Sequence, residues 1–257
     1  MTDYTAREIM VTAAADELDN GESTLVGTGI PMLACNLAKA THAPDLQLVY
    51  ESGVVDSELL TGGLPDIISG PKPASNAVSI LPQFEGLSTY LQGGRIDVGF
   101  LGGAQVDKHG NLNSTVVGDY DDPTVRLPGS GGACEIACNA GRTLVITPHE
   151  PRRFPAEVDF VTSPGYVDGR DGRQELGLNG GPEAVITDKA VLRFDDAGEA
   201  YVDALHPGVS RAEVREATGW DLAFGTEVGR TDEPSAETVR LLREELDPTG
   251  QVINATE

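Results

Sequence analysis

Basic residues are scarce in this sequence. Lysine and arginine together number 18, against 41 aspartates and glutamates, which gives a formal net charge of −23. Such a charge opposes binding to nucleic-acid phosphates and to anionic membranes, so we expect neither as a partner. The carboxylates are spread from end to end and form no acidic block. This distribution is typical of a surface adapted to high salt, where ions screen the self-repulsion, and equally of a generic acidic cytosolic protein.

Cysteines and long apolar runs are few as well. The three cysteines, Cys35, Cys134 and Cys138, are too few and odd in number for a disulfide framework, and no histidine stands at metal-ligand spacing from them. We therefore expect small, mostly buried thiols and no metal site. No run of about eighteen apolar residues could span a bilayer, and the first residues lack the pattern of a signal peptide, so the expected location is the cytoplasm.

The order of the predicted elements indicates an α/β protein. A capping box at residues 5–8 begins a helix that we expect to end near Leu18. Because glycine turns and helical patterns alternate with short apolar strands, we expect an open, mostly parallel sheet covered by helices on both faces. These strands are predicted at residues 24–26, 46–50, 98–101 and 143–146.

The second half of the chain shows a different pattern. From about Phe154 the segments shorten, and strands at 158–161 and 184–187 predict a mixed or antiparallel continuation of the sheet. Residues 61–76 are expected to form a loop or lid, and residues 234–246 a last helix. All 257 residues are expected to form a single domain.

A carboxylate follows the second predicted strand. Residues 48–50 are apolar or aromatic, and the chain then enters Glu51, Ser52 and Gly53. A strand in a covered sheet is apolar along its length, so its first polar residue marks the carboxyl end, where open α/β sheets bind ligands. Glu51 is therefore a candidate for chemistry, and the alternative is an ordinary solvated turn residue.

Two glycine-rich turns are further candidates. The first contains Gly27 and Gly29 and partly matches a dinucleotide fingerprint, but Met32 stands where close helix packing requires Gly or Ala. A tight turn that a ligand or partner chain approaches is the better interpretation. The second turn, PGSGGA at 128–133, precedes a helical pattern. It could hold a phosphate or stabilise an oxyanion with its backbone N–H groups, and a structural turn is the alternative.

No histidine is placed to activate a hydroxyl or thiol nucleophile. His149 follows a proline at the end of a predicted strand and His206 precedes a proline, so we interpret both as turn or surface residues. No Gly-x-Ser-x-Gly elbow occurs. An acyl-transfer enzyme with this sequence would need a nucleophile that works without a base. A glutamate qualifies because its reference pKa of about 4.3 leaves it ionised at neutral pH.

The stretch YESGVVD at 50–56 resembles the catalytic segment of the β subunits of family I CoA-transferases, most closely the glutaconate CoA-transferase type. The likeness extends over nearly the whole chain and is specific for the family more than for the substrate. It continues in VGTGIP at 26–31, APD at 43–45, GGAQVDKHGNLN at 102–113, PGSGGA at 128–133, RRF at 152–154, VTSPG at 161–165, HPG at 206–208 and TGWDL at 218–222.

The resemblance implies a mechanism and a set of site residues. Glu51 corresponds to the nucleophilic glutamate, which would form an acyl anhydride and then a glutamyl-CoA thioester in a ping-pong exchange. Gly131, Gly132 and Ala133 correspond to the segment whose backbone donors stabilise the oxyanion. Candidate contacts to substrate or CoA are Gly27, Gly29, Ser52, Gly53, Gln105 and Arg126. Arg126, Arg152 and Arg153 are candidates for holding a dicarboxylic, glutaconate-like acid, with surface salt bridging as the alternative.

The resemblance also implies what accompanies the chain. Coenzyme A is expected as a co-substrate, without a metal or nucleotide cofactor, and an α subunit is expected as the partner that completes the acid pocket. Two other functions stay open. One is a CoA-dependent hydrolase or ring-cleaving enzyme on the same fold, although the related hydrolases lack a glutamate at the position of Glu51. The other is a ligand-binding or regulatory module on a sugar-phosphate isomerase-like scaffold.

Overall fold

The computed structural model describes residues 3–58, 63–65 and 70–255, and the chain divides into two compact units. The terminal unit comprises residues 1–100 and 233–257, and the central unit comprises residues 101–232. The expectation of a single domain stays a prediction. Among the described residues, no helix has both the length and the apolar character needed to cross a membrane.

The terminal unit begins with strand and helix in alternation. Its elements are α1 (Ala6–Ala15), β1 (Ser23–Val26), α2 (Ile30–Ala40), β2 (Gln47–Tyr50), β3 (Val54–Val55), α3 (Pro71–Ala74), β4 (Ser79–Ile80), α4 (Gln83–Glu85), the π-helix η1 (Gly86–Gln92), β5 (Val98–Leu101), α8 (Ala236–Arg240) and the π-helix η2 (Leu241–Leu246). Strand β1 pairs in parallel with β2 and with β5, while β3 and β4 extend the sheet beyond β2 as antiparallel strands.

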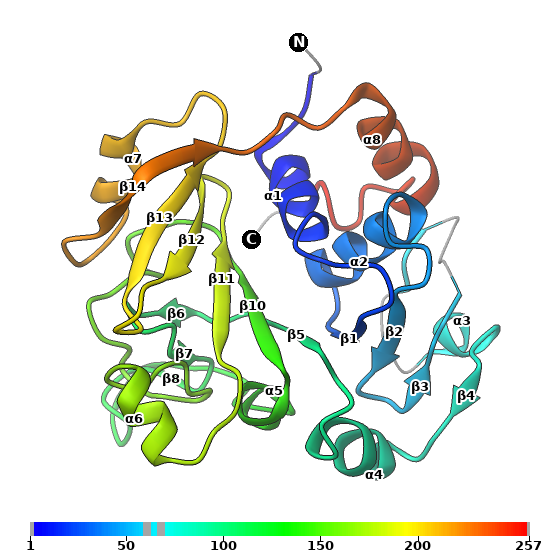
Figure 1. Cartoon of the computed structure of the whole chain (residues 1–257), viewed down its shortest axis with the longest axis horizontal. Helices are drawn as coiled ribbons and strands as arrows, with labels where there is room; N and C mark the ends of the chain where they lie inside the picture. Colours follow the sequence, from blue (N-terminus) through cyan, green and yellow to red (C-terminus); the bar gives the residue numbers. More distant parts are fainter. Residues whose placement is uncertain (1–2, 59–62, 66–69, 256–257) are drawn as a thin grey trace. The chain divides into compact units, whose positions relative to one another are not determined.

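Local sequence determines the helices of this unit. The predicted capping box is confirmed, because Thr5 Oγ1 accepts from the Glu8 N–H at 3.2 Å and Glu8 Oε2 accepts from the Thr5 N–H at 2.7 Å. The helix ends at Ala15, three residues earlier than predicted. The predicted last helix is also present, as α8 continued by η2, and it packs against α2 (Figure 1).

The central unit contains a second set of strands. Its elements are β6 (Gln105–Val106), β7 (Leu112–Asn113), β8 (Val116–Gly118), β9 (Pro123–Arg126), α5 (Ala133–Asn139), β10 (Arg142–Ile146), α6 (Arg170–Glu175), β11 (Pro182–Ile186), β12 (Ala190–Phe194), β13 (Ala200–Leu205), α7 (Arg211–Glu216) and β14 (Ala223–Arg230). Strands β10 and β11 are parallel, β12 and β13 continue the sheet antiparallel, and β14 pairs in parallel with β13. The β6–β7 and β8–β9 pairs form separate antiparallel ribbons, and Figure 1 shows β6, β7 and β8 close together in the central unit.

The predicted fold class is confirmed: the sheet is mostly parallel with helices and has antiparallel strands toward its C-terminal end. The strand predicted at 158–161 is wrong. The N–H of Asp159 donates to the side-chain Oε1 of Gln105 at 3.0 Å instead of to a neighbouring strand, and Phe160 and Val161 are exposed. The loop predicted at 61–76 contains the short helix α3, and its residues 61–62 and 66–69 lie outside the described residues.

Candidate active site

Glu51 stands on the turn that follows β2. Tyr50, the last residue of the strand, is fully buried, and Glu51 and Ser52 are half-buried. The Gly53 N–H donates to the Tyr50 carbonyl at 2.8 Å, which closes the turn around the glutamate. The carboxylate therefore leaves the sheet at the carboxyl end of a parallel strand, as the sequence predicted.

Gly53 fixes this turn from its other side. Its φ angle is 95°, and its carbonyl accepts from the Leu81 N–H at 2.8 Å. A Cβ atom at this position would lie 2.0 Å from the Leu81 carbonyl oxygen, so only glycine allows the two backbone segments to approach this closely. Gly53 thus has a structural role that accounts for it without a ligand.

The register of the sheet brings the first glycine turn beside Glu51. Val26 of β1 is paired with Tyr50 of β2, so the residues that follow them, Gly27 and Glu51, leave neighbouring strands at the same edge. Gly29 has a φ of 76° and precedes α2 as its N-cap. Gly27 has neither a positive φ nor a crowded position, because an added Cβ would meet only Pro31, at an ordinary 3.8 Å.

The second glycine turn lies in the central unit, before α5. Gly129 and Gly131 have positive φ angles of 96° and 50°, and Gly132 is the N-cap of the helix without a side-chain cap. The Ala133 N–H donates to the Ser130 carbonyl at 2.8 Å. Within the described residues, no hydrogen bond starts from the N–H of Gly131 or Gly132, so these two amides are the stronger donor candidates of the predicted three.

The other predicted contact residues of the central unit differ in how they are held. Gln105 is buried in β6, where its Oε1 accepts from Asn113 Nδ2 at 2.6 Å and its Nε2 donates to Asp159 at 3.0 Å. Arg126 is exposed on β9, donates to the Tyr120 carbonyl at 2.7 Å and lies over the Tyr120 ring. A ligand role for these two residues stays a prediction.

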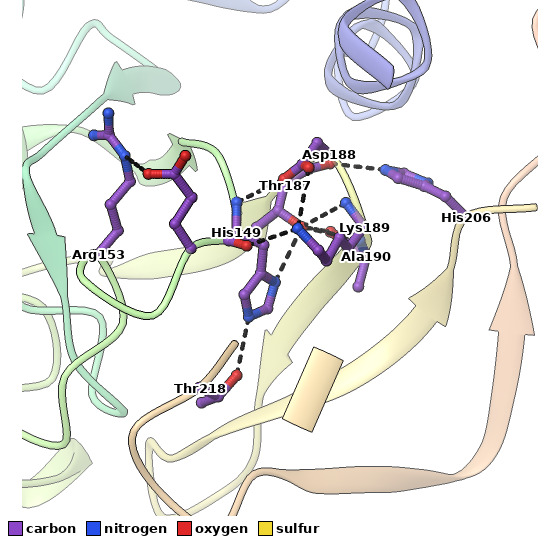
Figure 2. Close-up of polar contacts among 9 residues, drawn as sticks. His149, Arg153, Thr187, Asp188, Lys189, Ala190, His206 and Thr218 are labelled. Carbon is purple, nitrogen blue, oxygen red and sulfur yellow. Dashed lines mark hydrogen bonds and ion pairs between the residues drawn. The ribbon is translucent and has the colours of Figure 1, made fainter. Parts of the chain in front are cut away.

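Two histidines predicted at turns or on the surface are buried instead. His149 and His206 are each 1% exposed. His149 Nε2 contacts Thr218 Oγ1 at 3.0 Å and its Nδ1 contacts Thr187 Oγ1 at 3.3 Å (Figure 2). The His149 ring also stacks on Phe154. Both histidines lie outside the helices and strands, but the prediction of surface exposure was wrong because these partners are distant in sequence. Burial lowers the pKa of His149 to about 4, an effect that the Lys189 ammonium reinforces and Asp188 opposes.

The cysteines follow their prediction only in part. Cys35 is buried in α2, and burial raises the pKa of its thiol. Cys134 and Cys138 lie together on α5, as their spacing predicted, but both are half-buried. In the described part of the chain, no group of three or more His, Cys, Asp or Glu side chains is placed to hold a metal ion.

The chain is similar to known proteins over most of its length. Residues 7–217 match the family model described as coenzyme A transferase. The chain is 46% identical to the B subunit of 3-oxoadipate CoA-transferase from Pseudomonas knackmussii, over 95% of this chain and 94% of that protein. It is 39% identical to the B subunit of glutaconate CoA-transferase from Acidaminococcus fermentans, over 96% and 94% of the two chains.

Structure comparison agrees with sequence comparison. The crystal structure of glutaconate coenzyme A-transferase from Acidaminococcus fermentans superposes with a TM-score of 0.91 and 36% identity, covering 99% of each chain. The strand exit that carries Glu51 and the glycine turn before α5 both lie within the part of the chain that these comparisons cover. The chain is a member of the coenzyme A transferase family.

Proposed function

We propose that this chain is the catalytic β subunit of a CoA-transferase that moves CoA from an acyl-CoA to a free dicarboxylic acid, with Glu51 as the nucleophile. The observation that carries the proposal is the half-exposed carboxylate of Glu51 on a turn whose backbone is held by Tyr50 on one side and Leu81 on the other. A carboxylate nucleophile on a fixed turn needs no neighbouring base.

The exchange then proceeds through two covalent states of Glu51. Its carboxylate attacks the thioester carbonyl, the C–S bond breaks, and CoA leaves as a thiolate from an acyl-glutamyl anhydride. The thiolate attacks the glutamyl carbonyl, which releases the first acid as a carboxylate and leaves a glutamyl-CoA thioester. The second acid reverses these steps and regenerates the Glu51 carboxylate. Each step exchanges one nucleophile for another at a carbonyl, so no proton or phosphate is consumed.

Oxyanions form on the attacked carbonyls in each step. The amides of Gly131 and Gly132 support a donor role because neither is used in a hydrogen bond within the described residues. Such donors contribute about 10² to 10³ each in rate. The space around Gly27 would accept a Cβ atom, so the packing of this chain does not itself require glycine there. This supports a ligand or a partner chain that approaches the site at Gly27.

The names of the relatives support a partner subunit and a class of acid. Both sequence relatives are named as the B subunits of their enzymes, and their names carry 3-oxoadipate and glutaconate, which are both dicarboxylic acids. We infer that this chain also assembles with an α subunit and takes a dicarboxylate of this class. Coenzyme A enters as a co-substrate.

The covalent state of Glu51 gives the direct test. The assembled α/β enzyme is incubated with an acyl-CoA and quenched with borohydride, and peptide mass spectrometry then locates the reduced residue. We expect modification at residue 51, none in Glu51→Ala, and normal modification in Glu58→Ala, a matched exposed carboxylate on the same segment. Glu51→Asp retracts the carboxylate by one methylene and should lose about 10²-fold or more in turnover.

The same experiment separates transfer from hydrolysis. The Cholesterol ring-cleaving hydrolase IpdB subunit of Rhodococcus jostii is 27% identical over 96% of this chain, so a hydrolytic relative exists on this fold. Thioester hydrolysis without a Glu51 adduct, or exchange that persists in Glu51→Ala, would refute the proposed transferase mechanism.

A further inference from the structure

A rigid loop follows β10 in the central unit and carries two adjacent arginines. Strand β10 is parallel to β11, so this loop leaves the sheet at the carboxyl end of a parallel strand. At its start, the His149 N–H donates to Asp188 Oδ1 at 2.6 Å, and the Lys189 ammonium donates to the His149 carbonyl at 2.7 Å. The His149 ring is held between Thr187 and Thr218 (Figure 2). The start of the loop is therefore fixed on three sides.

The end of the loop is fixed as well. The Arg153 carbonyl accepts from the Val106 N–H at 2.7 Å, and the Phe154 carbonyl accepts from the Gly219 N–H at 2.7 Å. Phe154 is fully buried and stacks on the His149 ring at 4.1 Å between centroids. Figure 2 shows the side chains of His149 and Arg153 pointing in different directions from this loop. The buried histidine thus anchors a backbone that presents arginine on its other side.

Two arginines and one glutamate on this loop form an ion-paired cluster. Glu150 Oε2 accepts from Arg152 Nε at 2.7 Å and from Arg153 Nε at 3.4 Å, so one carboxylate serves two guanidinium groups. The hydrogen bond from Arg152 lowers the pKa of Glu150, and the group stays an anion at neutral pH. These three residues together carry one net positive charge.

An open cavity of 440 Å³ adjoins the two arginines. Besides Arg152 and Arg153, its lining is apolar, with Val117 of β8, Val125 of β9 and Leu127 after it. Arg153 is 19% exposed in its side chain and also donates to the Gly103 carbonyl at 3.4 Å, while Arg152 is 70% exposed. The cavity therefore combines an apolar wall with two cationic groups at one place.

We propose that this cavity binds an anionic group carried on an aliphatic stem, with Arg152 and Arg153 as the anion-binding residues. The apolar wall accepts the stem and the guanidinium pair accepts a carboxylate or phosphate. The proposal rests on the proposed function only for the source of this ligand, which is either the distal carboxylate of the dicarboxylic acid or a phosphate of coenzyme A on its pantetheine stem.

The ion pair with Glu150 gives a test in which two variants act in opposite directions. Binding to the assembled α/β enzyme is measured by calorimetry at fixed ionic strength with glutarate, CoA and butyramide, the last as a ligand with an aliphatic stem but no anionic group. Glu150→Gln adds one net positive charge and should tighten anion binding about three- to tenfold. Arg153→Gln should weaken it about tenfold. Arg142→Gln is the matched control, because it removes a guanidinium paired with Glu183 elsewhere in the same unit.

Each outcome decides the proposal. A response of glutarate but not of butyramide identifies a carboxylate as the ligand, and a response of CoA identifies its phosphate. If neither ligand responds, or if Glu150→Gln weakens binding as Arg153→Gln does, the ion pair is only structural and the proposal is wrong. Borohydride trapping on the same variants separates this from the proposed function: an adduct on Glu51 without any binding response refutes the cavity alone, and a binding response without an adduct refutes the covalent mechanism alone.

Discussion

The neutral state of buried His149 should make the central unit sensitive to acid. In the folded chain the His149 pKa is lowered to about 4 by burial, whereas a histidine in the unfolded chain titrates near 6.5. Between these values the unfolded chain binds a proton that the folded chain does not. The contribution of neutral His149 to stability is therefore complete above pH 6.5 and falls as the pH falls from about 6.5 to about 4. The full contribution is about 3 kcal/mol, and about 2 kcal/mol of it is lost at pH 5.

The single tryptophan of the chain offers a local assay. Trp220 lies in the central unit with its ring 6.2 Å from that of Phe154, which in turn stacks on His149. Urea unfolding followed by tryptophan fluorescence therefore reports on the unit that contains His149. Measurements at pH 7 and pH 5 in high salt, which screens the surface carboxylates, should give a smaller free energy of unfolding at pH 5.

A variant isolates the contribution of this one side chain. Glutamine in His149→Gln can still hydrogen-bond between Thr187 and Thr218 but does not titrate. The stability difference between wild type and variant should change by about 2 kcal/mol from pH 7 to pH 5. His206, whose pKa is also lowered by burial, is present in both proteins and cancels in this difference. Parallel pH curves, or an NMR titration that places the His149 pKa near 6.5, would refute the reasoning.

Further predictions concern the turns and the buried charges. Gly53→Ala should cost at least about 2 kcal/mol of stability, because its φ is 95° and a Cβ would meet a backbone carbonyl at 2.0 Å. Gly27→Ala, at the same sheet edge, should change stability by less than about 0.5 kcal/mol yet lower kcat/KM, and unchanged kinetics would argue against a ligand approaching Gly27. Arg173→Met should cost about 3 kcal/mol or more in urea unfolding, because the buried guanidinium donates to four backbone carbonyls, and a neutral result would contradict that role. Glu8→Gln should lose about 1–3 kcal/mol by calorimetry at pH 7. Although burial alone raises the Glu8 pKa, the hydrogen bonds from Arg243 and Thr5 hold it below its usual value, so the loss should vanish as the pH falls below that range.

Structural features that depend only on neighbouring residues could be predicted from the sequence. The capping box at Thr5 and Glu8 closes over three positions, and the apolar spacing of Val239, Leu242 and Leu246 repeats within one helix. The position of Glu51 at the end of a buried strand was also readable, because the change from apolar to polar residues occurs along the chain. Helix caps and strand exits follow from short-range hydrogen bonding and burial pattern.

The burial and hydrogen-bond partners of a residue could not be predicted where they depend on residues distant in sequence. His149 contacts hydroxyl groups 38 and 69 positions away, so no local pattern marked it as buried. The strand predicted at 158–161 does not form, because the backbone N–H of Asp159 donates to the side chain of Gln105, 54 positions away. Glu150, Arg152 and Arg153 are close in sequence, but the apolar wall beside the two arginines comes from Val117 and Val125, which only the fold brings to this loop. A sequence specifies which groups are polar, but their burial, and with it their pKa and partners, is set only when the chain brings distant segments together.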